Sequence, residues 1–335
     1  SNNQNQNQNQ SAKANLPAVE KNSTLTKTSQ TSDQNQNQSR DQNLVTKKLG
    51  TFCPGCKIQT STFSPDGKHF ACAAREGNKS FIVLDGEEGR KYDNVYSIAF
   101  SPNSQHFAYE VKEGSKSFVV LDGEKSKRYD NIYPFTFSPD SQHLAYRAFD
   151  GGKRFMVLDG EEGKKYNDTY SFTFSPGSQH FAYVAFDGGK AFVVLDGKEG
   201  KKYDDVINFT FSPDSQHLAY IAEKGNKRFV VLDGKEGNKY DDIYWSEISY
   251  YSTFTFSPNS QHLVYLAKDG NKEFVVLDGK EGERYDDVDK FSFIFSSNSQ
   301  HFAYAAREGK KGFVVLDGKE GKEYNGAYSP TFSES

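Results

Sequence analysis

The sequence lacks both an excess of basic residues and a long apolar run. Its 41 Lys and Arg side chains are balanced by 45 Asp and Glu, which leaves a net charge of −4. A nucleic-acid-binding protein needs a basic surface to neutralise phosphates, so this balance argues against such a partner. The longest apolar runs, such as residues 229–232, have the length of a strand, whereas a membrane helix requires about 20 apolar residues. No membrane span is therefore expected.

The first fifty residues also lack aromatic side chains. No aromatic residue precedes Phe52, and 19 of residues 1–43 are Asn or Gln. A segment this polar cannot bury enough apolar surface to offset the entropy of ordering. We therefore expect residues 1–50 to form a disordered arm or tether and residues 51–335 to form the folded domain.

The chain begins at Ser1 without an initiator Met. Either the sequence is a fragment, or a segment was cleaved from its N-terminus. A signal segment with a lipid-attachment Cys upstream of Ser1 would make the arm a tether to a bacterial envelope, in the periplasm, on the surface or in a secreted form. A plain linker explains the same composition.

A repeat of about 37 residues begins near residue 58. It is marked by the seven histidines, which are separated by 37, 37, 37, 37, 45 and 39 residues: His69, His106, His143, His180, His217, His262 and His301. A period near 40 residues is typical of propellers, solenoids and arrays.

Each unit predicts four short strands, named a to d here. Strand a ends at Phe-Ser, as at Phe100 and Phe137, and Pro with Asn, Asp or Ser then makes a turn. Strand b starts at the His, and strand c is an unbroken Phe-Val-Val-Leu run of the kind found where both sheet faces are covered. An Asp-Gly turn leads to the short strand d, which ends at a Tyr. This even spacing, with no helical period, predicts an all-β fold, a β-propeller of seven four-stranded blades; a β-helix is the weaker rival.

The run from Phe63 to Lys68 (Phe-Ser-Pro-Asp-Gly-Lys), followed by an apolar strand, resembles the opening of WD-repeat and TolB-like propeller blades. Leu-Asp-Gly at the end of strand c lies where WD repeats have Trp-Asp. Leu84, Leu121 and Leu158 replace that Trp, and no Gly-His pair precedes strand a, so the TolB-like branch fits better. The resemblance covers residues 58–333 and implies a scaffold or receptor without naming a ligand.

The last residues supply an eighth candidate strand a, at residues 328–333. Either it replaces the first strand and clasps the ring, or it begins a further blade. The sequence leaves this open.

The repeated polar residues are interpreted as structural. Seven equivalent histidines are expected to lie too far apart for a shared zinc ion and to cap or pack the same turn. The Asp-Gly pairs are turn formers, and no EF-hand spacing supports calcium. Cys53 and Cys56 form either a local disulfide or two free thiols, and Cys72 is a small buried replacement for the usual strand-b Tyr. No metal, cofactor or catalytic constellation is predicted.

Two neighbouring connections depart from the repeat. Eight residues are inserted between His217 and His262, in the segment that joins strand d to the next strand a, and the following connection is two residues longer than usual. Exposed aromatics on such loops are common in binding hot spots, although the loop could also fold over the channel and pack on itself. The candidate binding residues are Asp241, Asp242, Tyr244, Trp245, Glu247, Tyr250, Tyr251, Asp286 and Asp287.

These observations favour a non-enzymatic scaffold that binds a protein or peptide, with the acidic residues suiting a basic partner. The alternative is a propeller enzyme, a hydrolase or lyase with a channel active site. Such an enzyme would show catalytic residues as exceptions to the repeat, and no carboxylate unique to one blade is identified at this stage.

Overall fold

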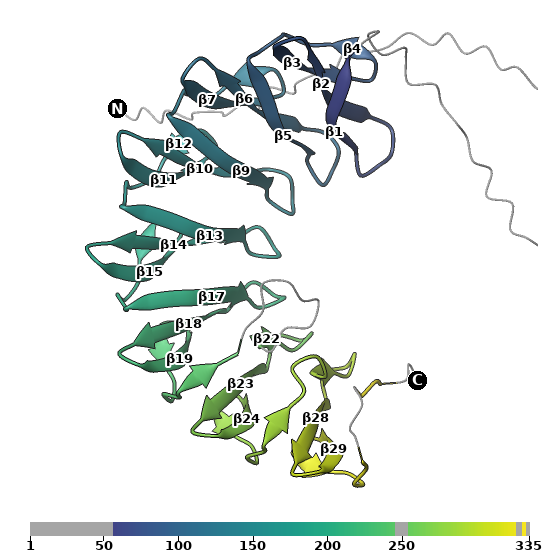
Figure 1. The fold of residues 1–335 in the computed structure, drawn as a ribbon, viewed down its shortest axis with the longest axis vertical. Helices are drawn as coiled ribbons and strands as arrows, with labels where there is room; N and C mark the ends of the chain where they lie inside the picture. The colour runs from purple at the N-terminus through teal and green to yellow at the C-terminus, as the bar shows by residue number, and fades with distance from the viewer. Residues whose placement is uncertain (1–55, 245–253, 326–329, 333–335) are drawn as a thin grey trace, which may run out of the picture.

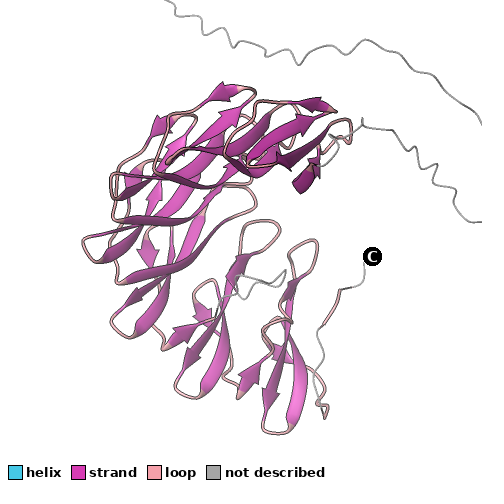
Figure 2. Cartoon of the chain, turned by 45° about the horizontal axis from the view of Figure 1, so that its top comes forward, coloured by secondary structure: helices cyan, strands magenta, loops and turns pink. Residues whose placement is uncertain are grey.

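The computed structural model describes residues 56–244, 254–325 and 330–332, and all regular structure in these segments is β (Figures 1 and 2). The strands form seven antiparallel sheets, each with the order a-b-c-d. The protein is therefore an all-β propeller with seven four-stranded blades.

The strands follow the repeat closely. The a strands of blades 1–5 are β1 (Lys57–Phe63), β5 (Asn94–Phe100), β9 (Asn131–Phe137), β13 (Asp168–Phe174) and β17 (Asp205–Phe211). The b strands are β2 (Phe70–Glu76), β6 (Phe107–Glu113), β10 (Leu144–Asp150), β14 (Phe181–Asp187), β18 (Leu218–Lys224), β23 (Leu263–Asp269) and β28 (Phe302–Glu308). The c strands are β3 (Lys79–Leu84), β7 (Lys116–Leu121), β11 (Lys153–Leu158), β15 (Lys190–Leu195), β19 (Lys227–Leu232), β24 (Lys272–Leu277) and β29 (Lys311–Leu316). The d strands are β4 (Glu87–Glu88), β8 (Glu124–Lys125), β12 (Glu161–Glu162), β16 (Lys198–Glu199), β20 (Lys235–Glu236), β25 (Lys280–Glu281) and β30 (Lys319–Glu320).

In blades 6 and 7 strand a is split into two pieces. Blade 6 has β21 (Asp242–Ile243) and β22 (Phe254–Phe256), and both pair with β23. Blade 7 has β26 (Asp287–Val288) and β27 (Ile294–Phe295), and both pair with β28. The extra residues thus interrupt strand a itself. The prediction that they lie ahead of strand a was wrong, because residues 242–243 keep the same pairing with strand b as the start of an uninterrupted strand.

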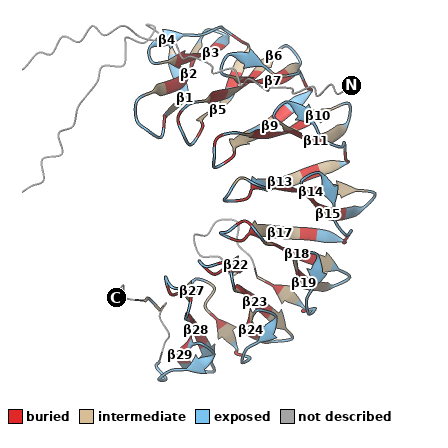
Figure 3. Ribbon diagram, turned by 180° about the vertical axis from the view of Figure 1, so that it is seen from behind, coloured by how far each residue is buried: buried red, intermediate tan, exposed pale blue. Residues whose placement is uncertain are grey.

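The cores lie between consecutive blades. Between blades 4 and 5, for example, Val184, Val193 and Tyr203 of one blade pack against Leu218 and Phe229 of the next. The same pattern joins each neighbouring pair from blade 1 to blade 7, and buried residues follow the middle of every sheet (Figure 3). Each blade is therefore stabilised mainly by its neighbours.

The seven blades form an open arc, with blade 1 and blade 7 at its two ends (Figure 1). Phe63 at the end of β1 is 58% exposed, whereas its counterparts Phe174 and Phe211 are buried. The ring of Phe332 stacks on His301 with centroids 6.5 Å apart, as Phe211 stacks on His180 at 6.3 Å. On blade 7, Phe332 thus takes the position that a following strand a would supply, while β1 remains the first strand of blade 1.

Candidate functional site

The seven histidines form a repeated structural contact. In every blade the Nδ1 atom of the His lies 2.6–2.7 Å from one carboxylate oxygen of the Asp in the turn after strand c. The other carboxylate oxygen accepts the backbone N–H that follows the His; in blade 4, Asp196 Oδ1 accepts from Phe181 at 2.9 Å. Asp196 has a φ of 49°, a left-handed conformation that Asp tolerates better than most residues. The histidines therefore fasten the start of strand b to the Asp-Gly turn.

A second repeated contact joins neighbouring blades through the turn between strands a and b. The hydroxyl of a Ser in one blade accepts a backbone N–H from the preceding blade, as Ser178 accepts from Asp140 at 2.9 Å. Six such bonds are present, and the acceptors are Ser104, Ser141, Ser178, Ser215, Ser260 and Ser299. Blade 1 has Gly67 at the corresponding position, and that blade has no preceding neighbour in the arc.

Asp241 and Asp286 belong to a third repeated contact. Asp241 accepts a hydrogen bond from Lys227 Nζ at 2.8 Å and from the backbone N–H of Gly270 in the next blade at 2.7 Å. Asp286 does the same with Lys272 at 2.9 Å and Gly309 at 2.8 Å. These hydrogen bonds, led by the one from the lysine, hold the pKa of both carboxyls below its usual value.

Asp242 and Asp287 also lie in ion pairs. Asp242 pairs with Arg228 of blade 5, and Asp287 Oδ2 lies 3.5 Å from Arg307 of its own blade. Each of the four described carboxylates among the predicted binding residues thus has a cation as a neighbour. Lys227, Arg228 and Lys272 each also contact a second carboxylate.

Tyr244 lies between blades 6 and 7 and links the two interrupted strands. Its hydroxyl donates to Glu273 Oε1 at 2.6 Å, and Glu273 Oε2 accepts the backbone N–H of Val288 at 3.1 Å. The ammonium of Lys290 lies 3.8 Å from the centre of the Tyr244 ring, a cation–π contact. Burial, followed by the hydrogen bond to Glu273, raises the pKa of Tyr244, so the phenol stays protonated and donates.

The second interrupted strand carries an exposed aromatic side chain. Phe291 follows Lys290 in the segment between β26 and β27, and 59% of its surface is exposed. Its backbone N–H donates to Asp289 Oδ1 at 3.0 Å, and Ser292 donates to the carbonyl of Asp289 at 2.7 Å, so the segment is a defined turn. The two departures from the repeat therefore meet at one junction, which comprises Tyr244, Glu273, Lys290 and Phe291 and is called the blade 6–7 junction below.

The remaining predicted binding residues, Trp245, Glu247, Tyr250 and Tyr251, lie outside the described residues. They follow Tyr244 directly in the chain. Sequence reasoning missed Glu273, Lys290 and Phe291. Aligning the second residue of every strand c would have revealed Glu273, because the other blades have Ser, Arg, Ala or Gly there.

Two buried carboxylates are in fact unique to single blades, which corrects the sequence analysis. Glu110 in β6 is 5% exposed, and Glu273 in β24 is 7% exposed. Burial raises the pKa of Glu110 to about 7. Because Glu110 belongs to blade 2 and Glu273 to blade 6, they do not form a catalytic pair.

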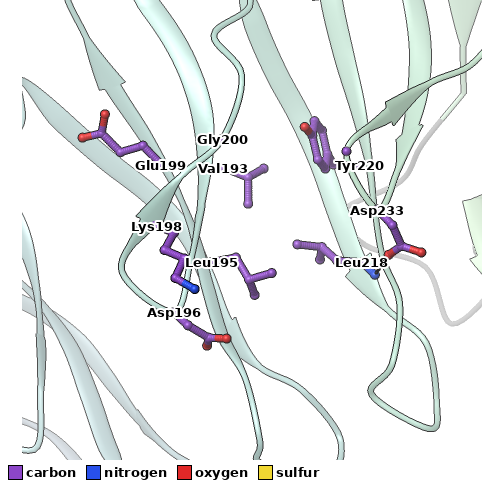
Figure 4. Close-up of a pocket in the computed structure, with 10 residues that line it drawn as sticks. Val193, Leu195, Asp196, Lys198, Glu199, Gly200, Leu218, Tyr220 and Asp233 are labelled. Carbon is purple, nitrogen blue, oxygen red and sulfur yellow. Dashed lines mark hydrogen bonds between the residues drawn. The ribbon is translucent and has the colours of Figure 1, made fainter.

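Grooves also repeat between blades. One of about 420 Å³ lies between blades 4 and 5, with Val193 and Leu195 on one wall and Leu218 and Tyr220 on the other (Figure 4). The equivalent residues line a groove of the same volume between blades 5 and 6. A groove that recurs with the repeat is a consequence of blade packing.

Within the described segments, no three His, Cys, Asp or Glu side chains are grouped so that they could hold a metal ion. In the same segments, no helix has the length and hydropathy needed to cross a bilayer.

Cys56 is disulfide-bonded, and Cys53 lies outside the described residues. Cys72 is a fully buried free thiol, as predicted.

No family model and no curated protein matches the chain. Among solved structures, it is similar to TolB from Acinetobacter baumannii, with 18% identity, a TM-score of 0.33 and coverage of 68% of this chain and 62% of that one. It is also similar to the β-propeller domain of the Trilobed protease from Pyrococcus furiosus (13% identity, TM-score 0.36, coverage 82% and 99%). A third is the Dos1 propeller (14% identity, TM-score 0.37, coverage 78% and 76%). Membership of the WD-repeat family stays a prediction.

Proposed function

We propose that this protein is a non-enzymatic interaction scaffold that binds a protein or peptide at the blade 6–7 junction. The observation that carries the proposal is the meeting of both repeat departures at Tyr244 and Lys290, beside the exposed ring of Phe291. Elsewhere in the described chain, the repeated His, Ser and Asp residues fasten turns within a blade or join neighbouring blades.

The junction combines the properties of a hot spot. Phe291 exposes a large apolar surface to solvent. The Tyr244 ring is held in place by the hydrogen bond from its hydroxyl to Glu273 and by the cation–π contact with Lys290. Large aromatics give contact area at low entropic cost, and Tyr and Trp add directed hydrogen bonds. Trp245, Tyr250 and Tyr251 would enlarge this aromatic surface.

Charge contributes less to the proposal than aromatic contact does. Four of the candidate carboxylates are paired with cations, namely those of Asp241, Asp242, Asp286 and Asp287. The preference for a basic partner therefore rests on Glu247 and on replacement of these cations by basic groups of the partner. Binding that does not change with the charge of the peptide would remove this part of the proposal and leave the aromatic part intact.

One feature supports a non-enzymatic role, and another supports an extracytoplasmic location. An active site needs unlike groups held together in one place, and the two exceptional carboxylates lie in different blades. The disulfide at Cys56 suits an oxidising environment such as the periplasm or the cell surface. A lipid anchor upstream of Ser1 would be consistent with that location.

The proposal is tested by selecting peptides from a displayed random library on the full chain. The affinity of the selected peptide is then measured for Trp245→Ala, Phe291→Ala and, as a matched control, Tyr96→Ala. Tyr96 is exposed, as Phe291 is, and it lies in the uninterrupted strand a of blade 2, at the repeat position of Tyr244. We expect each junction variant to lose about 2 kcal/mol or more of binding free energy and the control to lose little. Equal losses of binding free energy in all three variants would show that the peptide is recognised elsewhere on the arc.

A further inference from the structure

Arg147 is a further residue that departs from the repeat, and it lies far from the blade 6–7 junction. It occupies the fourth position of strand b in blade 3. Five of the seven blades have a small or apolar residue at this position: Ala73, Val184, Ile221, Leu266 and Ala305. Glu110 of blade 2 is the other charged residue there. A guanidinium in this position must be accommodated between two sheets.

Arg147 lines a cavity between blades 3 and 4. The cavity has a volume of about 370 Å³, and its other walls come from β9 and β13, with Tyr133 and Phe135 on one side and Tyr170 and Phe172 on the other. Ligand sites typically occupy about 300–1,000 Å³ and combine aromatic walls with a few polar groups. The cavity has the size and composition of a site for a small group.

The guanidinium is held in a fixed orientation. It stacks over the Tyr133 ring, with its central carbon 3.7 Å from the ring centre, and Nη1 donates to the carbonyl of Thr169. The side chain of Arg147 is 21% exposed. Since Arg carries five N–H donors in a planar fork, this arrangement presents a pre-organised edge of the kind that binds carboxylates.

Arg147 has no close carboxylate partner of its own. Asp168 is the nearest carboxylate, but its Oδ1 atom lies 4.0 Å from Arg147 Nη1 and 3.4 Å from Arg154 Nε. Two guanidiniums thus share one carboxylate. Asp205 lies at the edge of the cavity, where it accepts the hydroxyl of Tyr170 at 3.1 Å, and it makes no ion pair with Arg147 among the described residues. No carboxylate therefore lies closer to Arg147 than Asp168 at 4.0 Å, and the remaining N–H donors of the guanidinium can bind a ligand carboxylate.

The wall of this cavity also contains strained backbone. Ser171 has a φ of 44°. All other described non-glycine residues with positive φ belong to two repeated positions, the Asp of the Asp-Gly turn and the Ser two residues before the His. Ser171 is outside both. A left-handed residue of this kind costs about 1–3 kcal/mol, and such residues cluster at ligand sites.

We propose that the cavity between blades 3 and 4 binds a carboxylate group, with the Arg147 fork donating to its two oxygens and the rings of Tyr133 and Tyr170 flanking it. Asp168 and Asp205 at the edge of the cavity would repel a phosphate dianion more strongly than a monoanion. The carboxylate can belong to a free small molecule or to the C-terminus of a peptide, since both present the same two oxygens. This site is independent of the blade 6–7 junction.

The test uses the full chain and isothermal titration calorimetry. The probes are benzoate, its neutral analogue benzamide, inorganic phosphate, and a short peptide ending in Phe with a free or an amidated C-terminus. We expect saturable binding of benzoate and no binding of benzamide. Tighter binding of the free-carboxylate peptide than of both its amide and benzoate would identify a peptide as the source, and tighter binding of benzoate would identify a small molecule. Equal binding of benzoate and benzamide, or tighter binding of phosphate, would overturn the assignment.

The role of Arg147 is tested by Arg147→Lys, which keeps the charge but loses the planar fork. We expect benzoate to bind at least about tenfold more weakly, a loss of about 1.4 kcal/mol. Arg284→Lys is the control, because the guanidinium of Arg284 also lies over an aromatic ring, that of Phe274 at 4.3 Å, and this variant should bind benzoate as the wild type does. If the Lys variant does not fold, hydrogen exchange on the wild type decides: benzoate should slow exchange at residues 170–173. Unchanged affinity in the Lys variant, or protection confined to other blades, would refute the site.

Discussion

Replacing Asp196 by Ala tests whether the repeated His–Asp contact fastens the Asp-Gly turn to strand b within a blade. Asp196 performs three tasks in blade 4. Its Oδ1 atom accepts the backbone N–H of Phe181 at 2.9 Å, its Oδ2 atom lies 2.7 Å from His180 Nδ1, and its backbone has a φ of 49°. Ala removes the first two contacts and is strained in the third.

The expected cost is the sum of three terms. An N–H left without an acceptor at a residue only 7% exposed costs about 1–3 kcal/mol. The left-handed conformation costs Ala about 1–2 kcal/mol. The contact with His180 is partly exposed to solvent, so it contributes about 1 kcal/mol at most. We expect Asp196→Ala to lower the free energy of unfolding by about 2–6 kcal/mol.

Asp196→Asn is the matched control. Asn keeps an oxygen that can accept from Phe181 and tolerates the left-handed backbone, so only the charged part of the His180 contact is lost, at about 1 kcal/mol or less. Urea unfolding followed by circular dichroism measures both variants. If Ala and Asn destabilise the protein equally, the backbone acceptor and the φ requirement are not what fixes the turn.

Further predictions concern the core, the pH dependence and the arm. Val119 is buried against blade 3, so Val119→Asp places an unpaired charge between two sheets and should abolish cooperative unfolding; a soluble variant of near-native stability would contradict the strand assignment. Burial raises the pKa of Glu110 from 4.5 to about 7, so folding favours its protonated form and the wild type loses stability as pH rises from about 4.5 through about 7. Glu110→Gln cannot ionise, so its stability advantage should grow over this interval, by up to about 3 kcal/mol, and an advantage independent of pH in urea unfolding would refute the assignment. Removing residues 1–45 should leave the melting temperature unchanged, because the arm has no aromatic side chain to pack, and a fall of several degrees would show that the arm contacts the blades.

Much of the fold could be predicted from the repeat. The Asp-Gly turns follow from residues that tolerate positive φ, and the Phe-Val-Val-Leu strands follow from burial on both faces. The candidate binding site could be predicted less completely from the sequence. The length of the insertion was visible, but its position inside strand a depends on pairing of Asp242 and Ile243 with β23, which no local pattern records. Likewise, the acidity of Asp241 and Asp286 suggested a charged surface, whereas Lys227 and Lys272 pair with them through contacts that the strand pairing within each blade creates.

Single exceptions at repeated positions carried more information than the insertion alone. Glu110, Arg147 and Glu273 each replace a residue that is neutral in most blades, and all three lie between sheets. Aligning the blades position by position finds them, whereas a search for known catalytic motifs does not. Which of them face a cavity or an exposed surface depends on packing between blades, so only the structure separates Arg147 from Glu110.

The most direct test of the proposed function is hydrogen exchange on the full chain with and without a peptide selected from the library. The account predicts slower exchange at residues 242–256 and 287–295, the two interrupted strands, with little change at the corresponding residues of blades 2 and 5. Protection spread equally over all seven blades, or confined to blades far from this junction, would contradict the claim that the departures from the repeat are the recognition site.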